Sequence, residues 1–294
     1  MSTAVQHIVD GAALGSFYAL FALGIALIFG IMRLVNFAHG ELIMVGAFAV
    51  YLTRNLSWPL IVLAAVGSAI AMALITERIA FRPVRGASPA TMLITSFAVS
   101  YLLQSGARLI FTSLPKSADI NPLLRESFIV GGVFVSWLTV ITIGVTVLLL
   151  LALAVFLRGT AMGTQMRAAA EDFDAARLCA VDANRVVAVA FALSGLLAGA
   201  AALLIVGQTG TLFPTMGLTP VLFGFTAAVI GGMDSLAGAV LGGYLLGAGS
   251  TTLTLMLPTS VAPFRDAFLF MLVMVVLTLR PEGIVRGRGV VSRV

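Results

Sequence analysis

The chain has 294 residues, of which 60% are hydrophobic and 10% charged, and its formal net charge is +5. Ordinary soluble domains are about 45–50% apolar and about 25% charged. A soluble chain of this composition would expose apolar patches that promote aggregation, so composition excludes a soluble globular protein and predicts an integral membrane protein.

Other totals exclude further classes. The single cysteine, Cys179, cannot form an intrachain disulfide framework. The N-terminus carries Asp10 and no basic residue before the first apolar run, so it does not predict a cleaved signal peptide. The arginines are scattered between apolar runs, which a positive-inside bias explains better than nucleic-acid binding does. We therefore expect a lipid bilayer, and no nucleic acid, as a partner.

Long apolar runs separated by polar residues predict an all-α, polytopic transmembrane bundle in which residues 1–294 form one domain. About 20 continuous apolar residues span a bilayer as a helix, whereas a β-barrel needs alternating segments of about ten. The second and seventh runs are short and could be partial or re-entrant helices, which leaves the count at eight or nine. The expected helices cover 11–32, 40–53, 60–79, 91–113, 136–157, 188–207, 218–232, 236–256 and 264–280.

The first interruption, LVNFAHGEL at 34–42, places Asn36, His39, Gly40 and Glu41 between two apolar runs. Such side chains are costly next to lipid. One interpretation is a helix stop and restart in which Asn36 caps and polar groups satisfy broken backbone bonds. The other is a broken helix that lines a transport route, because irregular backbone at membrane depth faces cavities. The two interpretations are compatible.

A second interruption near the other end of the chain, GGMDSLAG at 231–238, contains Gly231, Gly232 and Asp234. One glycine-marked break early and one late suggest a structural repeat. The spacings Gly238-x-x-x-Gly242 and Gly243-x-x-x-Gly247 also predict a close helix interface. With only His7 and His39 as histidines, and no carboxylate cluster at ligand spacing, we expect no metal site.

The polar stretch at 158–187 combines charges with a helical pattern, unlike the loop expected at 112–128. Residues 166–181 are rich in good helix formers, and its charged pairs Arg167–Glu171 and Asp174–Arg177 are spaced to meet on a helix face. A short helix over 167–181 is expected, either solvated or docked in a groove of another protein. The residues expected to couple to a partner are Arg167, Glu171, Asp172, Phe173, Ala176, Leu178 and Val181.

Four stretches together resemble the branched-chain amino-acid permease family of ABC importers. They are GSFYALFALGIALIFGIMRLVNFAHGELIMVGAF at 15–48, RAAAEDFDAARLCAVDANRV at 167–186, GFTAAVIGGMDSLAGAVLGGYLLG at 224–247 and LRPEGIVRGRG at 279–289. The length resembles the shorter of that family's two permease subunits. Two positions depart from the family's pattern, with Ala180 where glycine is usual and Phe223 where lysine is common.

The resemblance implies uptake of branched-chain or related aliphatic amino acids. It also implies a second permease subunit, two cytoplasmic ATPase subunits that bind the ATP, and an external substrate-binding protein, with no cofactor in this chain. A zwitterion with an apolar tail favours a mildly polar route. Candidate side chains are Tyr18, Asn36, Thr95, Ser96, Gln104 and Gln208. Urea or short amides remain alternative substrates.

Three residue patterns weigh against other function classes. A Walker A motif needs Gly-Lys-Ser/Thr, and the sole lysine, Lys116, follows Pro115. A stand-alone secondary carrier usually places carboxylates within its spans, whereas Glu41, Glu77 and Asp234 lie at expected helix ends or breaks. The intramembrane serines lack a neighbouring base, so we expect a transport subunit and no enzyme.

The basic residues predict the orientation. If 158–187 is cytoplasmic and the nine spans alternate, 12 of the 17 basic residues lie inside. The positive-inside rule then places the N-terminus outside and the C-terminus in the cytoplasm. If one of the short spans is re-entrant, the N-terminus lies on the other side. We expect a multi-pass protein of the plasma membrane, the inner membrane in a cell that has two.

Overall fold

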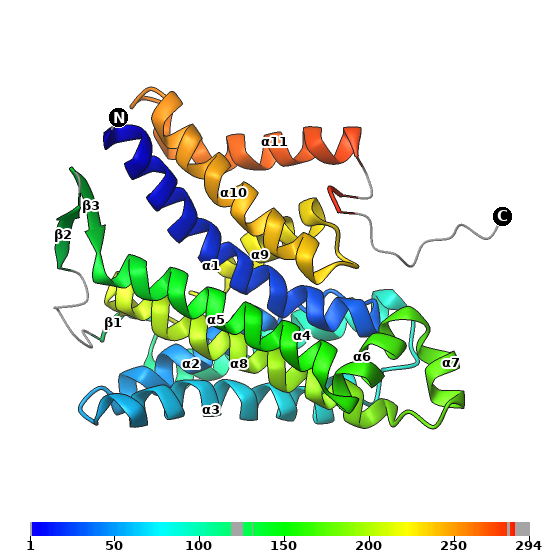
Figure 1. Cartoon of the computed structure of the whole chain (residues 1–294). Coiled ribbons are helices and arrows are strands. Elements are labelled where there is room, and N and C mark those ends of the chain that lie inside the picture. Colours follow the sequence, from blue (N-terminus) through cyan, green and yellow to red (C-terminus); the bar gives the residue numbers. More distant parts are fainter. Residues whose placement is uncertain (1, 119–125, 131, 281–282, 286–294) are drawn as a thin grey trace.

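The computed structural model describes residues 2–118, 126–130, 132–280 and 283–285. It is a bundle of helices (Figure 1), and the described residues include an apolar helix at each of the nine expected positions. Seven are long and apolar enough to cross a membrane: α1 Ser2–Met32, α3 Trp58–Thr76, α4 Pro89–Phe111, α5 Trp137–Gly159, α8 Ala183–Thr209, α10 Leu236–Met256, and α11 Arg265–Leu279 together with the turn Ala262–Phe264 before it. Two are shorter: α2 His39–Thr53 and α9 Leu218–Gly231. The predicted all-α fold of a multi-pass membrane protein is confirmed.

The remaining elements mark the two ends of the bundle (Figure 1). Helices α6 Ala161–Glu171 and α7 Phe173–Leu178 lie at one end, the α6/α7 end. At the other, the hairpin end, β2 Ser127–Val130 pairs antiparallel with β3 Val133–Ser136, and β1 Lys116–Ser117 pairs with β4 Thr211–Leu212. A π-helical turn, Glu77–Phe81, extends α3, and a 3₁₀ turn, Ala262–Phe264, precedes α11.

Some expected features fall partly outside the described residues. The closing element at 279–289 is described only at 279–280 and 283–285, so Arg286, Arg288 and Arg293 lie outside the description. The same holds for 119–125 of the expected loop at 112–128.

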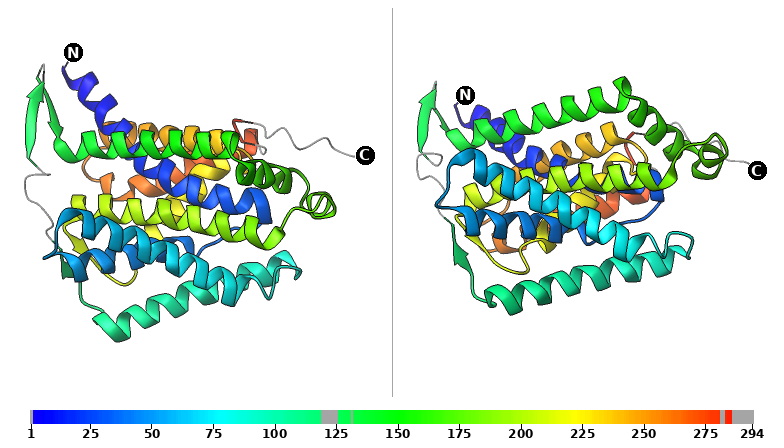
Figure 2. Two further views of the ribbon diagram at one scale, coloured as in Figure 1. Left: turned by 60° about the horizontal axis from the view of Figure 1, so that its bottom comes forward. Right: turned by 90° about the horizontal axis from the view of Figure 1, so that it is seen from below.

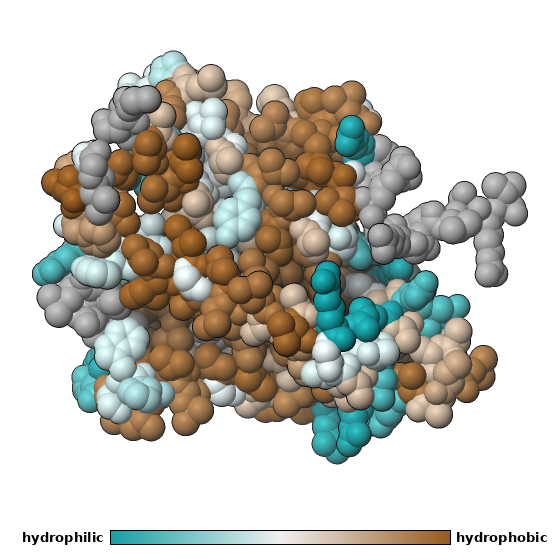
Figure 3. All heavy atoms as spheres, viewed as in Figure 1, coloured by the Kyte–Doolittle hydropathy of each residue, from teal (hydrophilic) through white to brown (hydrophobic). Residues whose placement is uncertain are grey.

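Helices α1 and α8 form the centre of the bundle and are its most buried long helices. Helices α3, α4, α5 and α11 lie outside them and expose apolar side chains. In both views of Figure 2, α4 runs along one side of the bundle. Figure 3 shows hydrophobic residues across the face that α1, α5 and α10 form, with hydrophilic residues gathered near α6 and α7. This distribution suits a bundle whose sides face lipid.

The two short helices start in the middle of the bundle. After α1 ends near the α6/α7 end, residues 33–38 return into the bundle, and α2 runs from there to the hairpin end. Residues 213–217 enter from the hairpin end in the same way, and α9 runs towards the α6/α7 end. The two starts touch, because a Cβ atom at Gly40 would overlap the carbonyl oxygen of Gly217, and one at Gly217 would overlap that of Gly40.

The two returning segments have the same local hydrogen bonds. The amide of His39 donates to the carbonyl of Asn36 at 3.2 Å, and the amide of Met216 donates to that of Phe213 at 3.1 Å. Glu41 N bonds Ala38 O at 3.1 Å, as Leu218 N bonds Thr215 O at 3.3 Å. Each residue of the second set lies 177 positions after its counterpart. The chain therefore contains an inverted repeat centred on Gly40 and Gly217.

The packing of the neighbouring helices follows the same repeat. Helix α1 packs on α10 as α8 packs on α3, and α2 packs on α3 as α9 packs on α10. Glycines allow the close pairs: Gly243 and Gly247 of α10 lie against α1, and Gly195 and Gly199 of α8 lie against α3. Close backbone approach between small residues is the usual basis of helix association in membranes.

The prediction that the interruption at 231–238 is the repeat counterpart of the first break was wrong. Residues 231–238 form the turn that joins α9 to α10 at the α6/α7 end, where Gly231 and Gly238 approach closely. The true counterpart of 36–40 is 213–217. The glycine spacings of α10 also serve two interfaces and not one, because Gly242 lies against α9 while Gly243 and Gly247 lie against α1.

We predict that Gly40→Ala destabilises the protein, because its new methyl group has no room beside the Gly217 backbone. Overpacking of this kind costs about 1–3 kcal/mol. Thermal unfolding of the purified chain measures the effect. The matched control is Gly67→Ala in α3, since a Cβ there has no atom within 4 Å. Equal stability of the two variants would contradict the close contact.

Candidate functional site

Asn36 turns the returning chain into α2. Its side chain is 1% exposed, and its Oδ1 accepts from the amide of Ala38 at 3.0 Å. The residue preceding α2 is Ala38, which supplies no side-chain cap. Asn36 therefore satisfies the backbone two residues before the helix, close to the capping role expected for it.

His39 ties together three helices. It is 1% exposed, and its Nδ1 lies 2.9 Å from the hydroxyl of Ser194 on α8. That hydroxyl also donates to the carbonyl of Gly24 on α1 at 3.1 Å. Since a hydroxyl has one proton to give, His39 donates from Nδ1. The ring occupies the space beside Gly24, where a Cβ would overlap it.

Glu41 connects the break to α4. Its Oε1 accepts from Ser100 at 2.9 Å and from Gln104 at 2.8 Å. The residue as a whole is 1% exposed. Gln104 also bonds Ser100 at 3.2 Å, and its Oε1 accepts from Arg108 at 3.5 Å. Oε2 has no partner among the described residues. A buried carboxylate of this kind is stable only when hydrogen-bonded.

Helix α4 touches the bundle along a narrow stripe. Its Phe97 stacks on Phe37 of the break at 4.5 Å between ring centroids, and its Phe111 stacks on Phe48 of α2 at 4.2 Å. Between these rings lies the Glu41 cluster with Ser100 and Gln104. The opposite side of α4 is exposed, as Leu109 (87%) shows. Polar bonds and ring stacking therefore hold α4 to the break.

Tyr18 belongs to a separate aromatic group. Its ring stacks on Phe223 of α9 at 4.8 Å, and Phe223 lies 5.5 Å from Phe270 of α11. Phe223 is 5% exposed, so the residue that departs from the resembled pattern fills the junction of α1, α9 and α11 with an apolar ring.

The other residues expected at the path lie at the α6/α7 end. Asp234 forms an ion pair with Arg33, which follows α1. Gly232 has a φ of 103°, which favours glycine. The amides of Ile284 and Val285 donate to the carbonyls of Ile230 and Gly231 at 2.8 and 3.0 Å, so the closing element satisfies the end of α9. Gly231, Gly232 and Asp234 therefore build a joint distant from Glu41.

The expected single helix over 167–181 was wrong. It is broken at Asp172, whose backbone is extended with φ −149° and ψ 106°. The Asp172 carboxylate accepts from the amides of Asp174 at 3.1 Å and Ala175 at 2.9 Å, and so caps α7. An aspartate in a helical run can compete with the helix by this local bonding. Asp174 and Arg177 do form the expected pair, at 3.9 Å.

The segment's side chains face different ways. Phe173 is partly buried against this chain's own core, Ala176 is buried, and Leu178 is 90% exposed. Val181 is also partly buried against the core. Arg167 bonds Thr164 at 3.3 Å, and Arg167 and Glu171 line a cavity between α6 and the transmembrane helices. The exposed apolar side chain is thus Leu178.

Ala180 ends this segment in a left-handed conformation, with φ 61°. Glycine adopts this conformation without a steric cost, whereas the Cβ of alanine comes too close to the following carbonyl oxygen. The left-handed backbone at this position therefore explains why the resembled family usually has glycine there.

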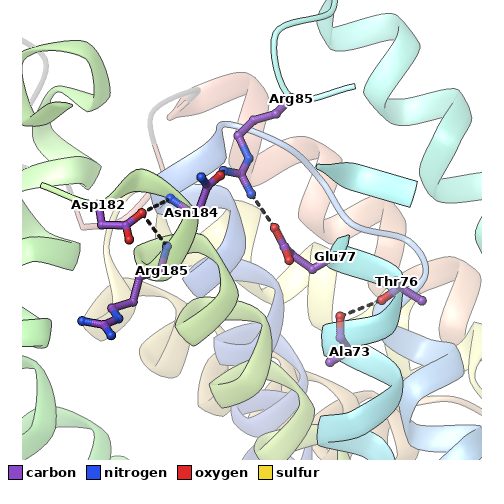
Figure 4. A network of polar contacts seen from close by, with 7 residues as sticks. All are labelled: Ala73, Thr76, Glu77, Arg85, Asp182, Asn184 and Arg185. Carbon is purple, nitrogen blue, oxygen red and sulfur yellow. Dashed lines mark hydrogen bonds and ion pairs between the residues drawn. The ribbon is translucent and has the colours of Figure 1, made fainter. Parts of the chain in front are cut away.

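A polar network fixes the start of α8 beside the segment (Figure 4). Asp182 caps α8 by accepting from the amides of Asn184 at 3.0 Å and Arg185 at 3.2 Å. Arg85, from the connection between α3 and α4, donates to Asn184 at 2.8 Å and forms an ion pair with the buried Glu77. Burial lowers the pKa of Arg85, and Glu77 opposes that effect. The network joins α3 and α8 to the loop before α4.

The family model described as the permease component of branched-chain amino acid transport systems matches residues 7–277. The chain belongs to the branched-chain amino-acid permease family.

Relatives of this permease match it along nearly its whole length. The high-affinity branched-chain amino acid transport system permease protein BraD of Pseudomonas aeruginosa is 34% identical, covering 99% of this chain and 98% of the relative. The corresponding LivH proteins of Salmonella typhimurium and Escherichia coli strain K12 are each 32% identical, covering 99% of this chain and 97% of the relative.

Several important contacts of the permease were not expected from single residues. Ser100 was not among the expected path residues, yet it bonds Glu41. The intramembrane serines were expected to lack a neighbouring base, yet Ser194 bonds His39. Of the other polar candidates, Thr95 and Ser96 bond carbonyls of their own helix. Gln208 lines a small cavity between α1, α5 and α8. Gln104 reaches the break, where it bonds Glu41.

We predict that Gln104→Leu destabilises the attachment of α4, because it removes a donor from a buried carboxyl group. Leaving a buried acceptor unpaired costs about 1–3 kcal/mol. The readout is thiol labelling of Val99→Cys, buried on α4, in a Cys179→Ser background, which should become faster. Thr95→Val, whose hydroxyl bonds only its own helix, is the control.

A double-mutant cycle with Glu41→Gln isolates the interaction. We expect Gln104→Leu to cost less in the Glu41→Gln background, because a neutral amide is cheaper to leave unpaired than a carboxylate. Additive effects within about 0.5 kcal/mol would contradict the Glu41–Gln104 contact.

Proposed function

We propose that this chain is a membrane-spanning subunit of an ABC importer for branched-chain or related aliphatic amino acids. The carrying observation is the near full-length match to permeases of high-affinity branched-chain amino acid transport systems. The chain has no Walker A lysine, since its sole lysine follows Pro115. Two partner ATPase subunits in the cytoplasm bind the ATP, and an external binding protein delivers the substrate.

The transport path runs along the face where α9 lies between α4 and α11. Leu218 and Leu222, at the mid-bundle start of α9, are 48% and 41% exposed there. Behind this face lie Glu41 and Gln104 on one side and the Tyr18–Phe223 stack on the other. A second permease subunit packs against the same face, so the break residues line the route between the two subunits.

The ATPase subunits dock at α7. This short helix presents Leu178, which is 90% exposed, while Phe173 and Ala176 hold it against the bundle. An exposed apolar side chain on a capped helix suits a groove on a partner. The α6/α7 end is the cytoplasmic one in the orientation that the arginine bias predicts, and Ile284 and Val285 lie at the same end, against Ile230 and Gly231.

Reconstitution tests the function. Proteoliposomes that contain this chain, its second permease subunit and the ATPases should accumulate leucine only under two conditions. ATP must be present on the side of the membrane where the ATPases lie, and the binding protein must be present on the opposite side. Liposomes with this chain alone should not. Concentrative uptake by the chain alone under a proton or sodium gradient would overturn the proposed ABC importer function. Uptake of urea in place of leucine would overturn the proposed substrate class.

We predict that Leu178→Ala weakens ATPase association without changing the fold. Truncation of an interface anchor costs about 1–2 kcal/mol, which is a roughly five- to thirtyfold loss of affinity. Pull-down of the ATPase subunits measures this loss. Phe173→Ala should instead lower thermal stability, because Phe173 packs on the chain's own core.

Asp174→Ala is the control for Leu178→Ala, because an exposed ion pair contributes little. Labelling of Cys179, which is exposed beside α7, checks the orientation, since an impermeant thiol reagent should reach it only from the cytoplasmic side. Normal ATPase association in Leu178→Ala would exclude α7 as the docking helix.

A further inference from the structure

The α6/α7 end contains a cavity that neither the transport path nor the docking helix explains. Its volume is about 670 Å³, and it lies between the last turns of α1 and α5, helix α6 and the turn before α10. This volume falls in the range of sites for small molecules.

One part of the cavity wall is apolar. Leu27 and Ile31 of α1 and Leu157 of α5 line it. Gly30, one of the lining residues, has no atom within 4 Å of where its Cβ would be, so the wall there borders open space. In Figure 3, hydrophobic residues of α1 and α5 border the hydrophilic group near α6. The cavity therefore spans the boundary between an apolar belt and a charged end.

The charged part of the wall has an excess of positive charge. Arg33 and Asp234 pair with each other. The remaining charges that line the cavity are Arg158, Arg167 and Glu171. Among the described residues, Arg158 has no hydrogen bond or ion pair, and Arg167 donates only to Thr164. The two guanidinium groups thus have donors to spare.

We propose that this cavity binds an anionic phospholipid of the surrounding membrane, with its phosphate between Arg158 and Arg167 and an acyl chain along α1 and α5. Guanidinium groups bind phosphate through charge-assisted, often bidentate hydrogen bonds. Basic pockets between transmembrane helices are suited to anionic headgroups. Arg158 lies in the last turn of α5, which is the level at which headgroups meet a spanning helix.

Charge argues against the chain's own tail as the occupant. The residues that follow Val285 include Arg286, Arg288 and Arg293 and no acidic residue. A basic segment would be repelled by a wall whose unpaired charges are mainly positive. An anionic lipid instead balances the wall and covers its apolar part with an acyl chain.

Native mass spectrometry of the permease complex tests the proposal. The complex is placed in nanodiscs of phosphatidylcholine with a minority of phosphatidylglycerol and then released. We expect one phosphatidylglycerol retained for each copy of this chain. Arg158→Gln combined with Arg167→Gln should lower that occupancy at least about tenfold, because both charge-assisted contacts are lost. Arg78→Gln, at the same end but outside the cavity, should retain the lipid.

A second variant tests the site without altering its charges. Gly30→Leu should fill the cavity and displace the lipid, since its side chain points into open space. Retention of phosphatidylglycerol by both variants, or equal retention of phosphatidylcholine, would overturn the proposal. Displacement by inorganic phosphate alone would show a free-anion site, and displacement by added ATPase subunits would show a protein contact; either would overturn the lipid assignment. Lipid retention is measured separately from uptake, so the result of the lipid test does not depend on which substrate is transported.

Discussion

The contact between the backbones of Gly40 and Gly217 is the constraint on which the rest of the fold depends. Neither residue can carry a side chain without overlap with the other's carbonyl. The contact lets two half-length helices start at the same point in the middle of the bundle and run to opposite ends. Each is completed by an irregular segment that enters from the other side. Such backbone is tolerated at membrane depth only inside protein or beside a cavity.

Polar side chains offset the energetic cost of this broken backbone. Asn36 satisfies the turn into α2, His39 bridges α1 and α8, and Glu41 binds α4. Each of these groups is buried with at least one hydrogen bond, as buried polar groups generally are. The stop-and-restart interpretation of the break and the transport-route interpretation are thus compatible. The polar residues satisfy broken backbone and also tie α4, the flank of the proposed path, to the centre.

Hydropathy was sufficient to predict the nine apolar helices, because apolar length alone decides whether a helix can span. It failed where a single residue redirects the chain. Asp172 divides an otherwise good helix by capping the next one, and propensity alone does not reveal this. Residues 213–217 were missed because Phe213 and Met216 stand where the first break has Asn36 and His39, so the second break lacks the side chains that marked the first. A repeat search could have found it, since Leu-Ile-Phe-Gly before Gly40 and Leu-Ile-Val-Gly before Gly217 share their spacing.

The inverted repeat also shapes the electrostatic field at the centre of the bundle. Each helix carries the equivalent of about half a positive charge at its N-terminus, and α2 and α9 bring their N-termini together at Gly40 and Gly217. Glu41 lies in the first turn of α2, whereas the first turn of α9 has no acidic residue. One carboxyl group therefore stands beside two converging helix dipoles, which reduce the cost of burying its negative charge.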